Sequence, residues 1–86
     1  SDDTHPQLRE RTQKAMDNWC SLIVRIIDKG IARGEIKADV DPDEAATIMI
    51  SILEGSLMMG KLYGDMIYIK RGINHLHRYI EKDLAS

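Results

Sequence analysis

The segment spanning residues 42–63, PDEAATIMISILEGSLMMGKLY, constrains the fold more than any other part of this 86-residue chain. At 100° per residue, Thr47, Glu54 and Lys61 fall on one narrow line of a helix, and nearly everything else is apolar or small. A helix that is apolar around most of its girth must be covered from several directions. The chain has no run of about 18 apolar residues free of charge, so we expect no membrane span.

Both ends of this helix are marked by residues with strong positional preferences. Asp41 can cap the first turn, and Pro42 suits the first helical position. Gly64 ends the helix, because glycine readily takes the left-handed conformation. In the preceding connector, GEIKADV, the large apolar residues are Ile36 and Val40, and we expect them to pin the connector to the core.

An earlier helix is predicted from about residue 6 to residue 33. Thr4 can cap it, Pro6 fits its first turn, and Gly34 stops it. Apolar residues at spacings of three, four and seven draw a first stripe, formed by Leu8, Ala15, Trp19, Leu22 and Ile26. A second apolar stripe lies beside it, formed by Met16, Cys20, Ile23, Ile27 and Ile31.

A third helix is predicted from about residue 66 to residue 84, after Asp65, which can cap it. Its apolar seam comprises Met66, Ile69, Ile73, Leu76, Ile80 and Leu84. A weaker line next to the seam comprises Tyr68, Gly72 and Tyr79. The chain is therefore predicted to be all-α, with three long helices over about 6–33, 42–63 and 66–84.

These helices carry more apolar surface than three helices of one monomer can cover, and such exposure is unusual for a monomer. Gly55 and Gly60 each cost roughly 0.5–1 kcal/mol against alanine inside a helix. They need close packing in return, either within the chain or against a symmetry mate. We favour a homodimer in which the last two helices form a four-helix bundle. The expected interface comprises Ile48, Ile52, Gly55, Met59, Leu62, Tyr68, Gly72 and Tyr79.

Charge and composition argue against several functions. A net charge of -2 and a pI of about 5.8 argue against binding of nucleic acid or an anionic membrane by this chain. The single cysteine, Cys20, excludes an internal disulfide and fits a reducing cytosol. His75 and His77 are two positions apart and point to different sides of a helix, so they do not form a metal pair. We expect no catalytic residue, metal or cofactor.

The run KGIARGEIKADVDPDEAATIMISILEGSL, residues 29–57, resembles the C-terminal regulatory domain of the tetracycline-repressor (TetR) family of bacterial transcription factors. In that family a helix ends in glycine, Gly-Glu-Ile and an acidic DVDP turn follow, and the next helix contains Leu-Glu-Gly. The resemblance covers about residues 27–62. The matching positions are Gly30, Gly34, Glu35, Ile36, Asp39, Asp41, Pro42, Glu44, Ala45, Leu53, Glu54 and Gly55.

This resemblance implies a bacterial, cytoplasmic regulator whose C-terminal helices bind a small hydrophobic effector and hold a homodimer together. Operator DNA would be bound by an N-terminal helix-turn-helix that residues 1–86 do not include. The chain is therefore expected to be a C-terminal regulatory and dimerisation domain, present as a fragment. The helices missing from such a fragment would leave the second stripe of the first helix exposed.

Trp19 has two interpretations, and both stay open at this point. The indole either stacks on an effector or lies in the core between the first two helices, where its N–H would still need a partner. The candidate ligand-contacting residues are Met16, Trp19, Ile23, Met49 and Leu53.

Two other functional classes are considered. A stand-alone helical homodimeric adaptor without a ligand is the main alternative. A small helical enzyme resembling chorismate mutases would need several Arg or Lys side chains inside the bundle. Because Arg25, Lys29, Lys70 and Arg71 fall on polar faces, the chain is predicted not to be an enzyme.

Overall fold

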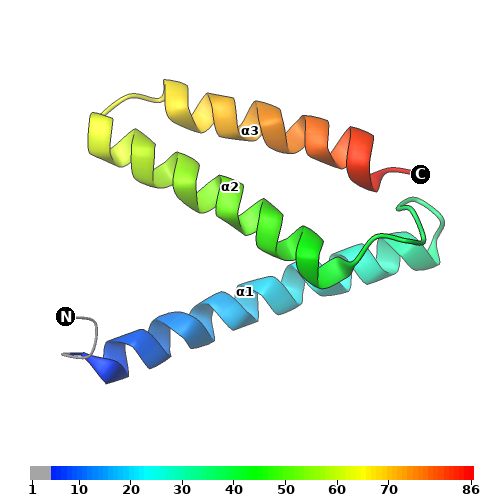
Figure 1. Ribbon diagram of the computed structural model, residues 1–86, viewed down its shortest axis with the longest axis horizontal. Coiled ribbons are helices and arrows are strands. Elements are labelled where there is room, and N and C mark those ends of the chain that lie inside the picture. The colour runs from blue at the N-terminus through cyan, green and yellow to red at the C-terminus, as the bar shows by residue number, and fades with distance from the viewer. Residues whose placement is uncertain (1–4) are drawn as a thin grey trace.

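A computed structural model describes residues 5–86 of the chain (Figure 1). It contains the helices α1 (Pro6–Ala32), α2 (Pro42–Tyr63) and α3 (Ile67–Tyr79), and a π-helical turn, η2 (Ile80–Leu84), that continues α3. The all-α class and the three predicted helices are confirmed. Their boundaries agree within one residue, except where α3 gives way to the π-helical turn.

The ends of α2 follow from the residues predicted to mark them. The Asp41 carboxylate accepts the backbone N–H groups of Asp43 and Glu44, at 3.0 and 3.4 Å, and so caps the helix. Gly64 ends α2 with a φ of +60°, and Gly34 takes a φ of +75° after α1. Both angles lie in the left-handed region that favours glycine.

The other helix starts are also local in origin. Pro6 lies in the first turn of α1, as predicted, whereas the predicted cap Thr4 lies outside the described residues. The Asp65 carboxylate accepts the backbone N–H of Ile67 at 2.9 Å, at the start of α3. Asp65 thus bonds to the first turn as predicted, although the cap position itself is Met66, whose side chain makes no capping bond.

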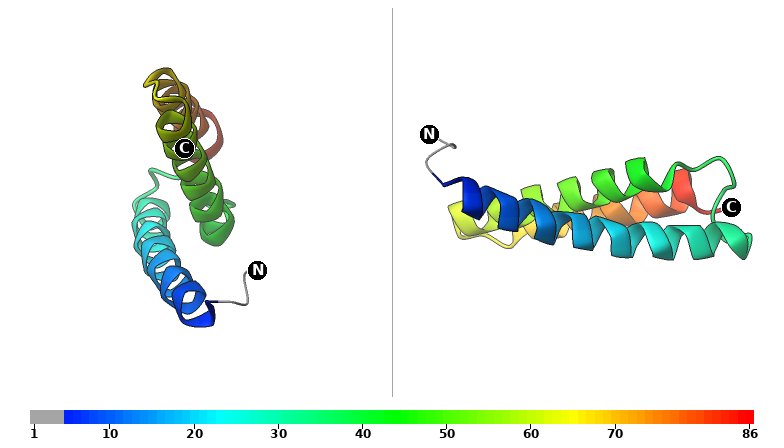
Figure 2. Two further views of the ribbon diagram at one scale, coloured as in Figure 1. Left: turned by 90° about the vertical axis from the view of Figure 1, so that its left-hand side faces the viewer. Right: turned by 90° about the horizontal axis from the view of Figure 1, so that it is seen from below.

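The three helices lie side by side, with α2 between α1 and α3 (Figure 1). The molecule measures 45 × 31 × 14 Å along its principal axes, so it is one helix layer thick (Figure 2). Its radius of gyration is 15.2 Å, whereas a compact domain of this length has a radius of about 12 Å. Domains usually pack two layers around a core, and this chain supplies one.

The core lies at one end of the layer, where α1 ends and α2 begins. Its buried members are Ile27, Ala45 and Leu84. Ile36 and Val40 pack against this cluster, so the prediction that they pin the connector is confirmed. The other residues packed on the cluster are Ile23, Ile31, Met49 and Tyr79.

The end of the third helix differs from the prediction. From Ile80 onward the backbone forms a π-helical turn, and the Ala85 N–H donates to the Ile80 carbonyl at 2.8 Å. Beyond that turn, Ala85 pairs with Ile36 in an isolated antiparallel bridge. The α-helix therefore stops at Tyr79, and a wider turn brings Leu84 into the core.

By length and composition, α2 is apolar enough to cross a membrane, with a mean hydropathy of 1.3 over its most apolar window. We expected no membrane span because no run of this length is free of charge. The mean hydropathy of α2 is nevertheless high, although the helix contains Glu54 and Lys61. A single helix of this kind is weak evidence, since core helices of soluble proteins also qualify. Only 22% of the window is buried within the chain, so α2 keeps apolar surface that its own chain leaves open.

Candidate functional site

The five residues predicted to contact a ligand lie on α1 and α2, and all of them are half-buried. Ile23 and Met49 pack against the buried core, so core packing explains why these two positions are apolar without a ligand. Toward its N-terminus α1 diverges from α2 (Figure 1), and Met16 and Trp19 lie nearer that end than Ile23 does. Leu53 lies farther along α2, away from its start. Contact with a ligand stays a prediction for the set.

The predicted exposure of the second stripe of α1 is wrong. Its members turn toward the core, where Ile27 is buried and Ile23 and Ile31 pack beside it. The first stripe is the open one, since Leu22 and Ile26 are 48% and 59% exposed. The two stripes could not be told apart from their spacing, because both have helical periodicity. As a result α1 offers its first stripe, rather than its second, to any further partner.

The α2 residues predicted to meet a partner follow one side of that helix and are called here the α2 flank. Ile48, Ile52 and Gly55 are half-buried. Farther along, Met59 and Leu62 are 41% and 72% exposed. The α2 flank is therefore apolar along its length and increasingly open toward the turn between α2 and α3.

Glycines in α2 and α3 show which close contacts the chain makes with itself. A Cβ on Gly60 would lie 3.0 Å from the Ile69 side chain, and one on Gly72 would collide with Ser56. These two glycines let α2 and α3 approach each other closely. Gly55 differs, because a Cβ there would meet nothing within 4 Å. Among residues 5–86, no contact accounts for a glycine at this helical position.

The α3 line predicted to face a partner instead faces its own chain. Gly72 is buried, Tyr79 packs against the core, and Tyr68 is half-buried. The predicted seam is more open, with Ile73 and Ile80 at 47% and 40% exposed. The physical reason is Gly72, because the missing side chain makes this side of α3 the one that can approach α2 closely.

Two tyrosines pack together at the turn between α2 and α3. The ring centroids of Tyr63 and Tyr68 are 5.1 Å apart, with the rings tilted by 34°. The guanidinium carbon of Arg71 lies 5.6 Å from the Tyr68 ring centroid, within the range of a cation–π contact. Tyr68 is thus held by neighbours within its own chain.

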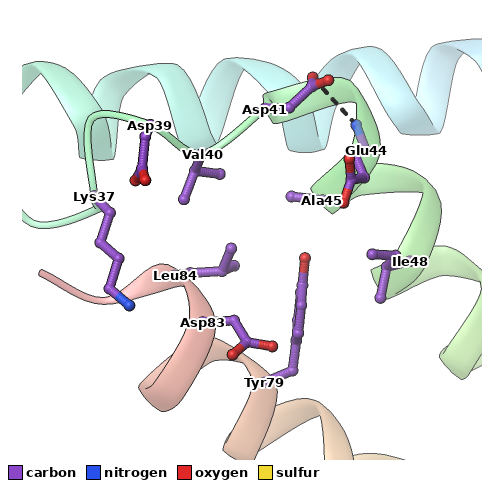
Figure 3. A pocket seen from close by; sticks show the side chains of 10 residues that line it. All are labelled: Lys37, Asp39, Val40, Asp41, Glu44, Ala45, Ile48, Tyr79, Asp83 and Leu84. Atoms are coloured by element: carbon purple, nitrogen blue, oxygen red, sulfur yellow. Dashed lines mark hydrogen bonds between the residues drawn. The ribbon is translucent and has the colours of Figure 1, made fainter.

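A cleft of about 420 Å³ lies where the connector, the start of α2 and the end of α3 meet (Figure 3). The Tyr79 ring projects into it from α3, with its hydroxyl pointing toward α2 (Figure 3). Burial raises the pKa of the Tyr79 hydroxyl, and the carboxylates of Asp83 and Glu44 raise it further. The full lining is Lys37, Asp39, Val40, Asp41, Glu44, Ala45, Ile48, Tyr79, Asp83 and Leu84.

The acidic side chains of this cleft do not form a metal centre. Within residues 5–86, no group of three or more His, Cys, Asp or Glu side chains is placed to hold a metal ion. The cleft was not predictable from the sequence, because two distant segments line it. The DVDP run was visible as a helix cap, but nothing in it indicated that Tyr79 and Asp83 would lie opposite.

Comparison with known proteins places this arrangement among transcriptional regulators. Residues 1–76 match the family model described as "Tetracyclin repressor-like, C-terminal domain". The crystal structure of a TetR transcriptional regulator from Chloroflexus aurantiacus J-10-FL is similar, with 36% sequence identity and a TM-score of 0.92. That alignment covers 99% of this chain and 43% of the regulator, so the chain spans less than half of its length. No curated protein matches the chain.

Proposed function

This chain belongs to the tetracycline repressor-like C-terminal domain family, and we propose that it is the dimerising, effector-sensing domain of a transcriptional regulator. The observation that carries the proposal is the single helix layer, 14 Å thick, whose central helix has an open apolar flank. Such a layer needs a second one to cover it. A second copy of the same chain would supply it.

The α2 flank has the properties that a two-fold interface needs. Such an interface uses the same patch on both copies, so the patch must complement itself. The α2 flank is apolar throughout, and Gly55 lies in its middle with free space around it. Two helix backbones can approach most closely at such a position, near the short end of the usual 8–10 Å range. With α3 beside each α2, the result would be a four-helix bundle.

Contacts within the chain change which α3 residues we assign to this interface. Gly72 and Tyr79 are already engaged with α2 and the core, and Tyr68 is engaged with Tyr63. We therefore assign Ile73 and Ile80 to the interface in their place, because both are exposed apolar residues of α3.

A small hydrophobic effector is proposed to bind beside α1. Met16 and Trp19 lie toward the end where α1 diverges from α2, and Leu22 and Ile26 add exposed apolar surface. A ligand that favoured one angle between α1 and α2 would shift the dimer toward one of two arrangements. Effector and operator affinities would then be coupled, although the two sites are separate.

DNA binding is proposed to reside in a part of the regulator that this chain does not contain. The related regulator is more than twice as long as the segment that aligns with this chain. A net charge of -2 does not suit a surface for phosphate binding. Bacterial cytoplasm is the location that such a role requires.

Family membership also bears on the two alternatives. The chain is a regulator domain, so it is not an enzyme of the chorismate-mutase kind. A stand-alone adaptor is less well supported than a regulator domain, because the aligned structure is a longer regulator whose 43% corresponds to this chain.

Sedimentation equilibrium tests the proposed dimer. The chain should sediment as a dimer at tens of micromolar, and Gly55→Leu should make it a monomer with unchanged helix content. Ser51→Leu is the matched control, because it adds the same side chain at an exposed position beside the polar line of the same helix. A monomeric parent chain, or a Gly55→Leu variant that dimerises as well as the control, would refute the proposal.

The single tryptophan of the chain, Trp19, allows a direct test of the effector site. A panel of hydrophobic small molecules should contain some that raise Tm and shift the Trp19 emission over the same concentration range. Met16→Ser should weaken both effects, and Leu57→Ser, an exposed position outside the proposed surfaces, should not. Ligands that raise Tm without changing the Trp19 emission would place the effector elsewhere.

A further inference from the structure

Residues that follow α3 are hydrogen-bonded to the connector between α1 and α2. The backbone N–H of Lys37 donates to the Leu84 carbonyl at 2.8 Å, and that of Ser86 donates to the Glu35 carbonyl at 3.0 Å. The Lys37 ammonium also donates to the carbonyl of Lys82 at 3.0 Å. We call this pairing of residues 35–37 with residues 82–86 the latch.

The local sequence explains why the latch forms here. The last carbonyls of any helix lack partners inside the helix, and the latch satisfies those of Lys82 and Leu84. Gly34 turns the chain after α1 with its positive φ. Gly30 lets Ile36 lie directly on α1, since a Cβ there would be 2.8 Å from Cγ1 of Ile36.

The latch is attached to α1 as well as to α3. The N–H groups of Glu35 and Ile36 both donate to the Gly30 carbonyl, at 2.9 and 3.1 Å, and so join the connector to the last turn of α1. On the other side, Ala85 is bonded to the π-helical turn through Ile80. One continuous series of hydrogen bonds therefore runs from the end of α1 to the end of α3.

This series is a second connection between two helices that are not neighbours. Within residues 5–86, α1 and α3 each pack on α2 and not on each other (Figure 1). Without the latch, a displacement of α1 reaches α3 only through side-chain packing, on α2 and in the cluster of Ile27, Ala45 and Leu84. With it, backbone hydrogen bonds also join the C-terminal ends of the two helices.

We propose that the latch is a releasable coupling element between α1 and α3. It is releasable because Glu35, Lys37 and Ser86 are exposed, and only Leu84 of the latch is deeply buried. Each of its hydrogen bonds contributes little net free energy in water, so these bonds can break in a local opening that leaves the helices folded. Its regulatory meaning rests on the proposed function, in which α1 bears the effector side and α3 the dimer side.

Native-state hydrogen exchange of the chain tests the latch through Ser86→Pro, which removes one donor. Ala85 has φ and ψ of -64° and 136°, so the residue before the new proline already has the conformation that such a residue prefers. Ser86→Ala is the matched control, because it keeps the N–H. The Lys37 amide should exchange about fivefold faster in Ser86→Pro than in the control, as loss of one such bond predicts.

Exchange at amides that the substitution does not touch distinguishes coupling between the two helices from local fraying of the chain end. The N–H groups of Glu35 and Ile36, which bond to α1, should also exchange faster in Ser86→Pro. Unchanged rates at these two amides relative to Ser86→Ala would overturn the proposal. If Ser86→Pro lowers the helix content, Lys37→Met decides instead on the same amides, because it removes only the ammonium donor.

The outcome does not depend on whether the chain dimerises or binds an effector. If Ser86→Pro speeds exchange at Glu35 and Ile36 but the chain sediments as a monomer, the latch is a coupling element without the proposed regulatory use. If the chain dimerises but the exchange rates of the Glu35 and Ile36 amides do not depend on residue 86, the proposed function stands and the latch proposal fails. The two failures are therefore distinguishable.

Discussion

The two ends of the α2–α3 hairpin differ in how deeply their apolar side chains are buried. At one end the connector, the end of α1 and the π-helical turn enclose Ile27, Ala45 and Leu84. At the other end, the tip, only two helices meet, and Met58 and Leu62 are 65% and 72% exposed. Along its length, α2 thus runs from the buried core to an exposed apolar surface.

This contrast shows how a small chain can divide its apolar residues between two uses. Burial near Leu84 stabilises the chain itself, because three segments meet there. Apolar residues at the tip lack a third segment, so their burial depends on another molecule. Substitutions at the buried end should therefore have the largest effects on stability, and those on the open flank and in the cleft the smallest.

The largest effect is expected from Leu84→Ala. It should lower the free energy of unfolding by about 2–5 kcal/mol, because it removes a buried side chain and leaves a cavity. Leu62→Ala at the tip should cost the isolated chain far less, since Leu62 is already in contact with solvent. Chemical denaturation at one low protein concentration measures both. Equal losses would mean that the two ends do not differ as described.

A smaller loss is expected where α2 and α3 touch. Gly72→Ala should destabilise the chain by about 1–3 kcal/mol, because overpacking forces the helices apart. The new methyl group would collide with Ser56, so adding Ser56→Gly should recover part of the loss in a double-mutant cycle. Additive losses in that cycle would show that Gly72 and Ser56 are not in contact.

Gly55→Ala should act in the opposite direction on stability. Alanine is favoured over glycine inside a helix by roughly 0.5–1 kcal/mol, and the structure leaves room for its methyl group. Denaturation of dilute, monomeric protein should therefore show a gain of that size. Sedimentation should show a weaker dimer, because the methyl group separates the two α2 helices. A gain in both measurements would move the interface away from Gly55.

The smallest effect concerns Tyr79 and alkaline pH. Burial and the nearby carboxylates raise the pKa of Tyr79 in the folded state, so above about pH 10 the folded chain binds more protons than the unfolded chain. Stability should fall as the pH rises from about 10 through the folded-state pKa. Tyr79→Phe should reduce that fall and leave the profile below it parallel to the parent's. Identical alkaline profiles would mean that Tyr79 does not titrate differently on folding.

Local features of the fold were predictable from the sequence alone. Asp41, Gly64 and Asp65 set helix ends through hydrogen bonds or dihedral angles that involve only their near neighbours. The resemblance to the regulator family was carried by the same stretch, because its turns and caps recur at fixed spacing. The anchoring of Ile36 and Val40 was also predictable, since they are the large apolar residues of a polar connector.

The orientation of the helices about their own axes was not predictable. α1 and α3 each carry two apolar stripes, and periodicity does not decide which one faces α2. Gly72 decides for α3, because contact with Ser56 requires both residues at the same height. The π-helical turn was also missed, because it depends on acceptors that Lys37 reaches from the distant connector.

The place of Leu84 in the core has a consequence for synthesis on the ribosome. When the chain is made from the N-terminus, Leu84 is the last member of the core to emerge, so the inward stripe of α1 and the start of α2 lack this packing partner until then. Contacts between distant parts of a chain form late, and apolar surface that waits for them is prone to aggregate. The nascent domain therefore passes through a stage in which α1 and the start of α2 have been made and the core that joins them is still incomplete.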